Sequence, residues 1–266
     1  MKIIALVQAR MTSTRLPGKV MLPLLNKSLL VRMVERVEKA RLIHEVIVAT
    51  STVEEDDHIE QECIQNNVSF FRGDPLDLLD RHYKAACESD ADIVLKIPSD
   101  CPLIDPSIID QVISFYLESS HFYDYVSNLH PATFPDGNDV ELMTFYALEK
   151  SWFEATRQME REHTTPYMWE HPVKFRVGNV LWKSGLDYSM SHRWTIDYKE
   201  DYLLIKEIFE TLYKTKPNFT LEDILELLER KPRLNEINRK FVGVNWYRDH
   251  LNELKTVGAD QTRQLI

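Results

Sequence analysis

A short polar segment from Ala9 to Lys19 contains the residue types needed to bind phosphate groups. Its cations are Arg10, Arg15 and Lys19, and hydroxyl residues and a Pro-Gly turn lie between them. Fixed cations and the exposed backbone N–H groups of such a loop bind phosphate oxygens. The segment is neither a Walker loop, which needs Gly-x4-Gly-Lys-Ser/Thr, nor a Gly-x-Gly-x-x-Gly dinucleotide loop. We therefore expect a polyphosphate-binding loop of another kind.

The elements around this loop predict an α/β sheet. The apolar run 3–7 is typical of a buried parallel strand, and open α/β sheets bind ligands at the carboxyl ends of such strands. Apolar runs alternating with helical patterns indicate βαβ units and then a mixed second half. Ser28, Thr52 and Asp105 are expected helix caps. The expected strands are 3–7, 45–50, 69–72, 93–97, 125–126, 140–143, 173–180 and one ending near Ile196, and the expected helices are 29–40, one after Thr52, 107–117, 144–156, 162–169, 200–213 and 221–229.

Composition narrows the class of protein. The chain has 266 residues, 44% of them hydrophobic and 28% charged, and a net charge of −10. This charge disfavours a nucleic-acid binder, and no apolar stretch approaches the roughly 20 residues that span a bilayer. Three scattered cysteines favour neither a disulfide framework nor a zinc site. We expect a cytoplasmic protein with one main domain at 1–230 and a C-terminal extension at 231–266 that docks on the core or on a partner subunit.

Six segments together resemble the sugar-acid cytidylyltransferases, and most of all their spore coat polysaccharide protein F branch. They cover about residues 1 to 215 in order and are Ala-Arg-x-x-Ser-x-Arg-Leu-Pro-Gly-Lys at 9–19, 72–81, Ser-Asp-Cys-Pro-Leu-Ile-Asp-Pro at 99–106, Asp-Gly-Asn-Asp-Val-Glu at 136–141, 161–167 and Arg-Trp-Thr-Ile-Asp at 193–197. The resemblance implies a three-layer Rossmann-like nucleotidyltransferase fold with a mixed, mostly parallel sheet. It implies that an acceptor hydroxyl attacks the α-phosphorus of CTP and that pyrophosphate leaves.

Two aspartates are the expected ligands of a Mg²⁺ ion. Asp100 follows the strand 93–97 at the same sheet edge as the loop, and Mg²⁺ prefers carboxylate and phosphate oxygens. Asp197 lies in a segment that resembles the family's strand-Asp-x-x-x-Asp element, whose first aspartate binds metal. Either aspartate can instead be structural, Asp100 as an acidic turn residue and Asp197 as a helix cap. The Asp-x-Asp at 90–92 precedes its strand and is expected at the opposite sheet edge.

Catalysis and substrate binding are assigned to further residues. Arg10, Arg15, Lys19 and Asp100 are the expected catalytic residues. The nucleotide is expected to contact a larger set comprising Ala9, Arg10, Ser13, Arg15, Lys19, Arg72, Asp80 and Ser99. An Asp80–Arg81 or Asp77–Arg81 pair on a solvated helix face is the structural alternative for Asp80.

The acceptor pocket is expected in the second half of the chain. Asp139 and Glu141 alternate on a strand and so project to one face, where Arg161 and His163 could meet them. Arg161 or Arg193 could bind an acceptor carboxylate or phosphate. His163 could accept the hydroxyl proton, since the ordinary pKa of histidine is near neutral.

Two other functions remain open at this point. One is a glycosyltransferase of the same fold that consumes a nucleotide sugar, although an Asp-x-Asp is missing at the right strand end. The other is a non-catalytic nucleotide-binding protein. The resemblance also implies a homodimer, and the aromatic stretch 145–169 fits an interface or an internal core equally well.

Overall fold

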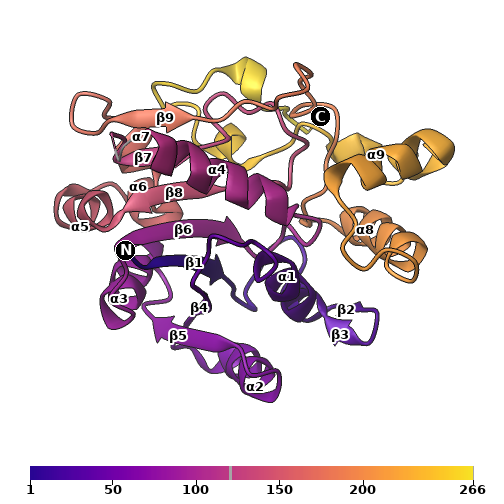
Figure 1. Ribbon diagram of the computed structural model, residues 1–266, viewed down its shortest axis with the longest axis horizontal. Coiled ribbons are helices and arrows are strands. Elements are labelled where there is room, and N and C mark those ends of the chain that lie inside the picture. The colour runs from indigo at the N-terminus through magenta and orange to yellow at the C-terminus, as the bar shows by residue number, and fades with distance from the viewer. Residues whose placement is uncertain (120–121, 266) are drawn as a thin grey trace.

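A seven-stranded sheet forms the centre of the molecule, with strand order β5-β4-β1-β6-β8-β7-β9 (Figure 1). The structure is a computed structural model and describes residues 1–119 and 122–265. The strands β5, β4, β1 and β6 are parallel, β8 is antiparallel to both β6 and β7, and β9 runs parallel to β7. The strands are β1 (Ile3–Gln8), β4 (Glu45–Ser51), β5 (Ser69–Gly73), β6 (Ile93–Pro98), β7 (Tyr125–Ser127), β8 (Glu141–Thr144) and β9 (Val177–Asn179), and a hairpin pairs β2 (Pro23–Leu24) with β3 (Lys27–Ser28).

Helices cover both faces of this sheet and bury two separate cores. Alternate residues of β1 point to opposite faces, so Ala5 and Val7 belong to one core and Ile4 and Leu6 to the other. The first core includes α1 (Leu29–Val37), α2 (Asp57–Gln65), α4 (Pro106–Glu118), α8 (Lys199–Leu212) and α9 (Leu221–Arg230), and the second includes α3 (Leu78–Glu88), α5 (Phe145–Glu154), α6 (Gln158–His163) and α7 (Pro166–Trp169). The expected three-layer, mostly parallel α/β fold is confirmed.

The first half of the chain agrees with the sequence predictions. The four parallel strands occur where the apolar runs are, each with bounds within one residue or so of those expected. Ser28 caps α1 by accepting a hydrogen bond from Val31 N at 3.2 Å, and Asp105 caps α4 through Ser107 N at 2.8 Å. Thr52 does not cap the next helix, because a 3₁₀ turn at Glu54–Asp56 precedes α2. The helix α3 is an addition to the predicted set.

Three elements of the second half differ from the predictions. The helix expected at 162–169 is two short helices, α6 and α7, because Thr164 adopts a positive φ of 71° and Pro166 has no N–H. Only Val177–Asn179 of the expected strand 173–180 is extended in the sheet. The strand expected to end near Ile196 is absent from the described residues, where this segment forms a single isolated bridge, Asp136 to Arg193.

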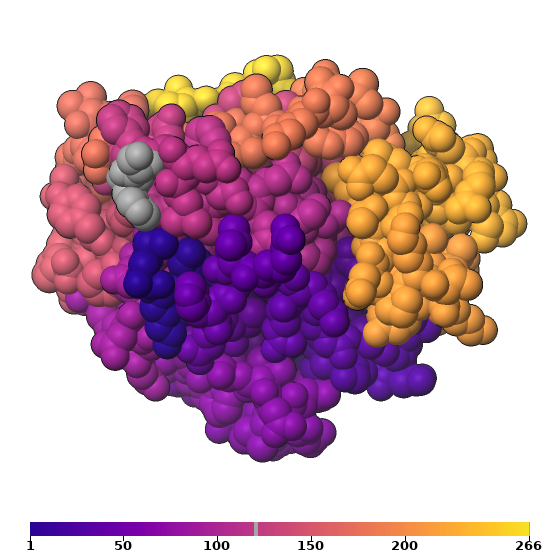
Figure 2. Space-filling view, viewed as in Figure 1, coloured from indigo at the N-terminus to yellow at the C-terminus, as the bar shows by residue number. Residues whose placement is uncertain are grey.

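The chain after α9 continues as short 3₁₀ turns that lie against the core. These are η3 (Pro232–Glu236), η4 (Arg239–Phe241), η5 (Trp246–Asp249) and η6 (Ala259–Gln261). Phe241 stacks on Tyr198 with ring centroids 3.6 Å apart, and Glu170 accepts hydrogen bonds from the backbone of Lys255 and Thr256. Helices α8 and α9 form a lobe beside the carboxyl ends of the parallel strands (Figures 1 and 2). Within the described residues, none of the helices is long and apolar enough to cross a membrane.

Candidate active site

The basic loop after β1 borders a cavity of about 220 Å³ at the carboxyl ends of β1 and β6. The loop is held from both sides, because Met11 N donates to Asp56 at 2.7 Å and Gly18 N donates to Met11 O at 2.9 Å. Gly18 has a φ of 67°, a conformation that favours glycine. Of the predicted residues, the cavity is lined by Ala9, Arg10, Ser13, Arg15, Lys19, Ser99, Asp100 and His163.

Lys19 joins the loop to both aspartates. Its ammonium donates to Asp100 Oδ2 at 2.8 Å, to Asp197 Oδ1 at 3.0 Å and to the carbonyl of Ile196 at 2.6 Å. Burial alone would lower the pKa of Lys19, but Asp100 and Asp197 outweigh it and raise the pKa above its ordinary value. Lys19 therefore remains charged at neutral pH, in contact with the cavity.

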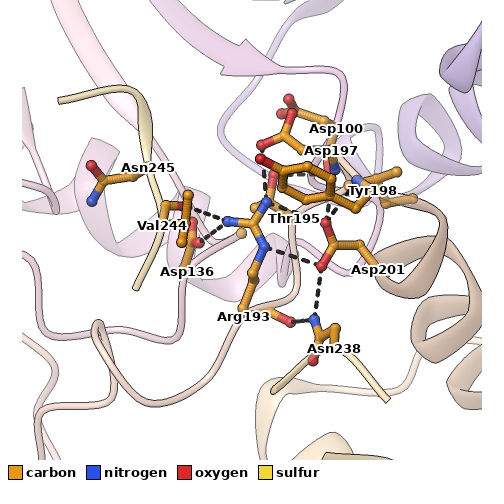
Figure 3. A network of polar contacts seen from close by, with 12 residues as sticks. Asp100, Asp136, Arg193, Thr195, Asp197, Tyr198, Asp201, Asn238, Val244 and Asn245 are labelled. Atoms are coloured by element: carbon orange, nitrogen blue, oxygen red, sulfur yellow. Dashed lines mark hydrogen bonds and ion pairs between the residues drawn. The ribbon is translucent and has the colours of Figure 1, made fainter. Parts of the chain in front are cut away.

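Behind Asp197 lies a second buried cation, Arg193 (Figure 3). Arg193 donates to Asp201 through Nε and Nη2, to Asp136 and the Val244 carbonyl through Nη1, and to Asp197 through Nη2. A guanidinium has five N–H groups, and these five contacts use them all. Arg193 is thus a structural cation that holds Asp197, and no N–H remains for the acceptor carboxylate that sequence reasoning assigned to it.

The carboxylate of Asp197 forms ion pairs with three cations. Arg15 donates to its Oδ1 at 2.7 Å, Lys19 to the same oxygen, and Arg193 to its Oδ2 at 2.9 Å. Burial would raise the pKa of Asp197, but these cations lower it far below its usual range. The Asp197 carboxylate is therefore ionised at neutral pH.

Asp100 and Asp197 are the candidate ligands of a Mg²⁺ ion. Asp100 lines the cavity, and its Oδ1 has only a weak thiol contact, from Cys101 Sγ at 3.6 Å. Asp197 does not line the cavity and its two oxygens accept from Arg15, Lys19 and Arg193, but it shares the Lys19 nitrogen with Asp100, within 3.0 Å of both carboxylates. Among the described residues, clusters of three or more His, Cys, Asp or Glu suited to a metal do not occur. The arrangement fits a Mg²⁺ ion held by one or two carboxylates with phosphate oxygens completing its shell.

Two of the residues expected to bind the nucleotide lie outside the cavity. Arg72 donates to the carbonyls of Ser51 and Val53 and pairs with Asp57 and Glu60, so it ties β5 to the α2 region. Asp80 accepts from Trp152 Nε1 at 2.9 Å and pairs with Lys84. The alternative for Asp80, a pair with Arg81 on a solvated helix face, was also wrong, because Asp80 is buried on α3 and its cationic partner is Lys84.

The expected meeting of acceptor residues does not occur as predicted. Arg161 donates to Asp77 at 2.8 Å through Nε and to the carbonyl of Trp152, and so it is engaged with α3 and α5. Glu141 forms a buried ion pair with Lys96 at 2.5 Å and accepts from the Tyr125 hydroxyl at 2.7 Å. Both side chains have structural partners, and neither lines the nucleotide cavity.

His163 lines the cavity but is poorly suited to accept a proton. Its ring stacks on Trp246 with centroids 3.9 Å apart. Burial, aided by the positive charge of Lys96, lowers the pKa of His163 to about 3. The near-neutral pKa on which its proposed role as a base depended is therefore wrong for this environment.

Further cavity residues were not foreseen from the sequence. Gln8, Arg81 and Glu162 all line the cavity, and the Oε1 atom of Gln8 is buried without a hydrogen-bond partner among the described residues. A ligand donor would satisfy this oxygen. The place of Gln8, as the last residue of a buried strand that opens the loop, was the signal in the sequence that could have identified it.

A family model and several known proteins match this chain over most of its length. A family model described as "Cytidylyltransferase" matches residues 4–242. The chain belongs to the cytidylyltransferase family. It is 34% identical to an uncharacterized protein of Methanocaldococcus jannaschii over 90% of this chain and 95% of that one, and 31% identical to the spore coat polysaccharide biosynthesis protein SpsF of Bacillus subtilis over 86% of this chain and 95% of that one. A solved cytidylyltransferase structure from Leptospira borgpetersenii has a TM-score of 0.82 and 35% identity, and covers 88% of this chain and 96% of that one.

Membership in the cytidylyltransferase family makes the protein a nucleotidyltransferase. The cations of the basic loop, Arg10, Arg15 and Lys19, line the cavity. The match ends at residue 242, so the turns from η5 onward lie outside the part of the chain that defines the family.

Proposed function

We propose that the protein transfers CMP from CTP to a hydroxyl of a sugar acid or related acceptor, with release of pyrophosphate and dependence on Mg²⁺. The observation that carries this proposal is the contact of Lys19 with Asp100 and Asp197 beside Arg10 and Arg15, at the mouth of one cavity. Cations and carboxylates in this arrangement are what a nucleotidyl transfer needs.

The residues of the site have different roles in the reaction. The acceptor oxygen forms a bond to the α-phosphorus while the bond to the bridging oxygen breaks, and negative charge develops on the phosphate oxygens. Arg10, Arg15 and Lys19 stabilise that charge as preorganised donors, each of which is typically worth about 3–4 kcal/mol. Asp100 and Asp197 would hold the Mg²⁺ ion, which neutralises the triphosphate when bound. The unpartnered Gln8 Oε1 offers an acceptor for a donor group of the nucleotide.

The direct test is pyrophosphate release. The purified protein is incubated with Mg²⁺ and each of the four nucleoside triphosphates, against a panel of ulosonic acids and phosphorylated sugars. Release that needs CTP, one acceptor and Mg²⁺, and that is lost in Asp100→Ala, supports the proposal. Full activity in Asp100→Ala would contradict it. A glycosyltransferase of this fold would instead release a nucleotide from a nucleotide sugar and no pyrophosphate.

We also propose a role in the synthesis of a surface polysaccharide, in the cytoplasm where nucleoside triphosphates are available. The support is the 31% identity to SpsF of Bacillus subtilis, whose name assigns it to spore coat polysaccharide biosynthesis. Deletion of the gene is expected to change the sugar composition of the surface glycan. Unchanged composition would argue against this role.

A homodimer is the proposed assembly. Tyr146 and Phe153 of α5 are 59% and 69% exposed, and their seven-residue spacing places them on one helix face. An exposed aromatic pair on one face suits an interface with a second copy. Light scattering should give twice the mass of the chain, and Phe153→Ser should shift it toward the monomer.

A further inference from the structure

A second cavity, of about 280 Å³, lies next to the nucleotide cavity. Its lining comes from the segment 128–139, from residues 187–190 and from the C-terminal turns, which contribute Asn245, Trp246, Tyr247, Asp260 and Gln261. Its volume is near the lower end of the roughly 300–1,000 Å³ of small-molecule pockets, which suits a group of monosaccharide size. Most of one wall thus lies beyond residue 242, outside the family match.

The two cavities share a wall. On one side, Asp136 lines the second cavity and pairs with Arg193 at 3.3 Å, and Arg193 pairs in turn with Asp197. On the other side, Trp246 of the second cavity stacks on His163 of the nucleotide cavity. An acceptor bound in the second cavity is therefore separated from the nucleotide only by side chains of the site itself.

The lining of the second cavity is acidic. Four carboxylates border it, and its described lining residues include no Lys, Arg or His. The side-chain amides of Asn128, Asn138 and Asn245 donate to the backbone carbonyls of Asn138, Pro135 and Gln261. Carboxylate oxygens only accept hydrogen bonds, so the charged groups of the lining favour donors on a ligand.

Asp139 is the carboxylate most in need of a donor. The backbone N–H of Gly137 donates to its Oδ1 at 3.3 Å. Burial, with the nearby charges of Asp100 and Glu141, raises the pKa of Asp139 to about 6. A bound donor would stabilise the ionised form, whereas a ligand carboxylate or phosphate would add a further negative charge to this wall.

We propose that this second cavity binds the distal part of the acceptor through hydrogen-bond donors of that acceptor, either sugar hydroxyls or a protonated amino group, and rejects carboxylate and phosphate groups. The inference rests on the proposed function and assigns the C-terminal turns to acceptor selection. A carboxylate on the acceptor then faces the cations of the nucleotide cavity, where Arg10 and Arg15 lie.

The test uses four sugars that share one pyranose ring: glucose, glucosamine, glucuronate and glucose 6-phosphate. Their binding to the full chain is followed by saturation-transfer NMR. Glucosamine or glucose is expected to bind, and Asp139→Asn should weaken glucosamine about tenfold or more and glucose less, since an amide oxygen still accepts but carries no charge. Asp260→Asn, an exposed position that leaves the core intact, should act in the same direction. Asp249→Asn, with a side chain 59% exposed outside the cavity, is the matched control.

The outcomes separate this inference from the proposed function. Binding of glucuronate or glucose 6-phosphate that is lost in Asp139→Asn and Asp260→Asn overturns the inference, and so does binding of none of the four sugars at millimolar concentration. Binding of glucosamine but not glucose identifies the donor as an amine, and binding of both identifies hydroxyls. CTP binding is measured separately on the same preparations. Loss of CTP binding would refute the proposed function while the sugar result still decides the inference.

Discussion

Replacement of Lys19 by Met removes one charge from the centre of the site while keeping a side chain of similar length. The ammonium is the common partner of Asp100, Asp197 and the Ile196 carbonyl, and its side chain is 11% exposed. Breaking a buried pair by removing one partner typically costs about 3–5 kcal/mol. Asp197 retains Arg15 and Arg193, so we place the loss near the lower end, at about 3 kcal/mol.

This stability loss has a measurable size. For a chain of this length a loss of about 3 kcal/mol lowers the melting temperature by about 6–12 °C. Because the pKa of Lys19 is raised in the folded state, its contribution is complete below the unfolded value of about 10.4 and is lost as the pH rises through the folded value. The gap between the wild type and Lys19→Met should therefore be constant near neutral pH and close only in strong alkali.

The catalytic effect is assayed on the folded variant. Loss of one preorganised cation should lower kcat by about 10²–10³-fold, which corresponds to about 3–4 kcal/mol in the transition state. Pyrophosphate release is measured at a temperature well below the melting point of both proteins. A folded Lys19→Met enzyme with wild-type kcat would refute the role of Lys19 in charge stabilisation, and an unchanged melting temperature would refute the assigned contacts.

Three more outcomes are expected. Asp100→Asn should lower kcat about 10²–10³-fold and raise the Mg²⁺ concentration needed for half-maximal rate, and an unchanged Mg²⁺ titration would contradict its place as a ligand. Arg193→Met should destabilise the fold by about 3–5 kcal/mol in urea unfolding, because its 1% exposed side chain neutralises three carboxylates, and a loss under about 1 kcal/mol would contradict this. Burial lowers the pKa of His82, His130 and His163 to about 3 or 4, so the unfolded chain takes up more protons below about pH 6.5. Stability should then fall from pH 6.5 toward pH 4, more steeply in the wild type than in His163→Asn, and parallel slopes would contradict the assignment.

The part of the site that could be predicted was encoded locally. The loop 9–19 directly follows a buried strand, and Asp100 follows another buried parallel strand, β6, so strand direction alone placed them at one edge. Short apolar runs bounded by turns specify parallel strands because such strands are buried on both faces. Lys19, Arg15 and Asp100 were accordingly predicted at one place and lie there.

The remaining part depends on partners that are distant in sequence. Arg161 pairs with Asp77, 84 residues away, and no local pattern indicates that its charge is already taken. The segment 193–197 alternates like a strand, yet its pairing is limited to one bridge with Asp136, and the Arg193 side chain is engaged in buried ion pairs instead. Tertiary contacts override β propensity in such a case. The second cavity could not be predicted from the sequence either, because one wall of it comes from turns at the end of the chain.

The contact between Arg193 and the Val244 carbonyl bears on how the protein is made. Lys19 contacts Ile196 and Asp197, which lie 177 and 178 residues after it in the chain. Arg193 contacts Val244, which lies 51 residues after Arg193. The N-terminus of the chain is synthesised first, and contacts between residues far apart in the sequence form late. The basic loop is therefore synthesised long before its partners, and the charged network closes only when residue 244 has left the ribosome. Until then the ribosome holds a chain with a folded sheet edge and an unfinished catalytic centre.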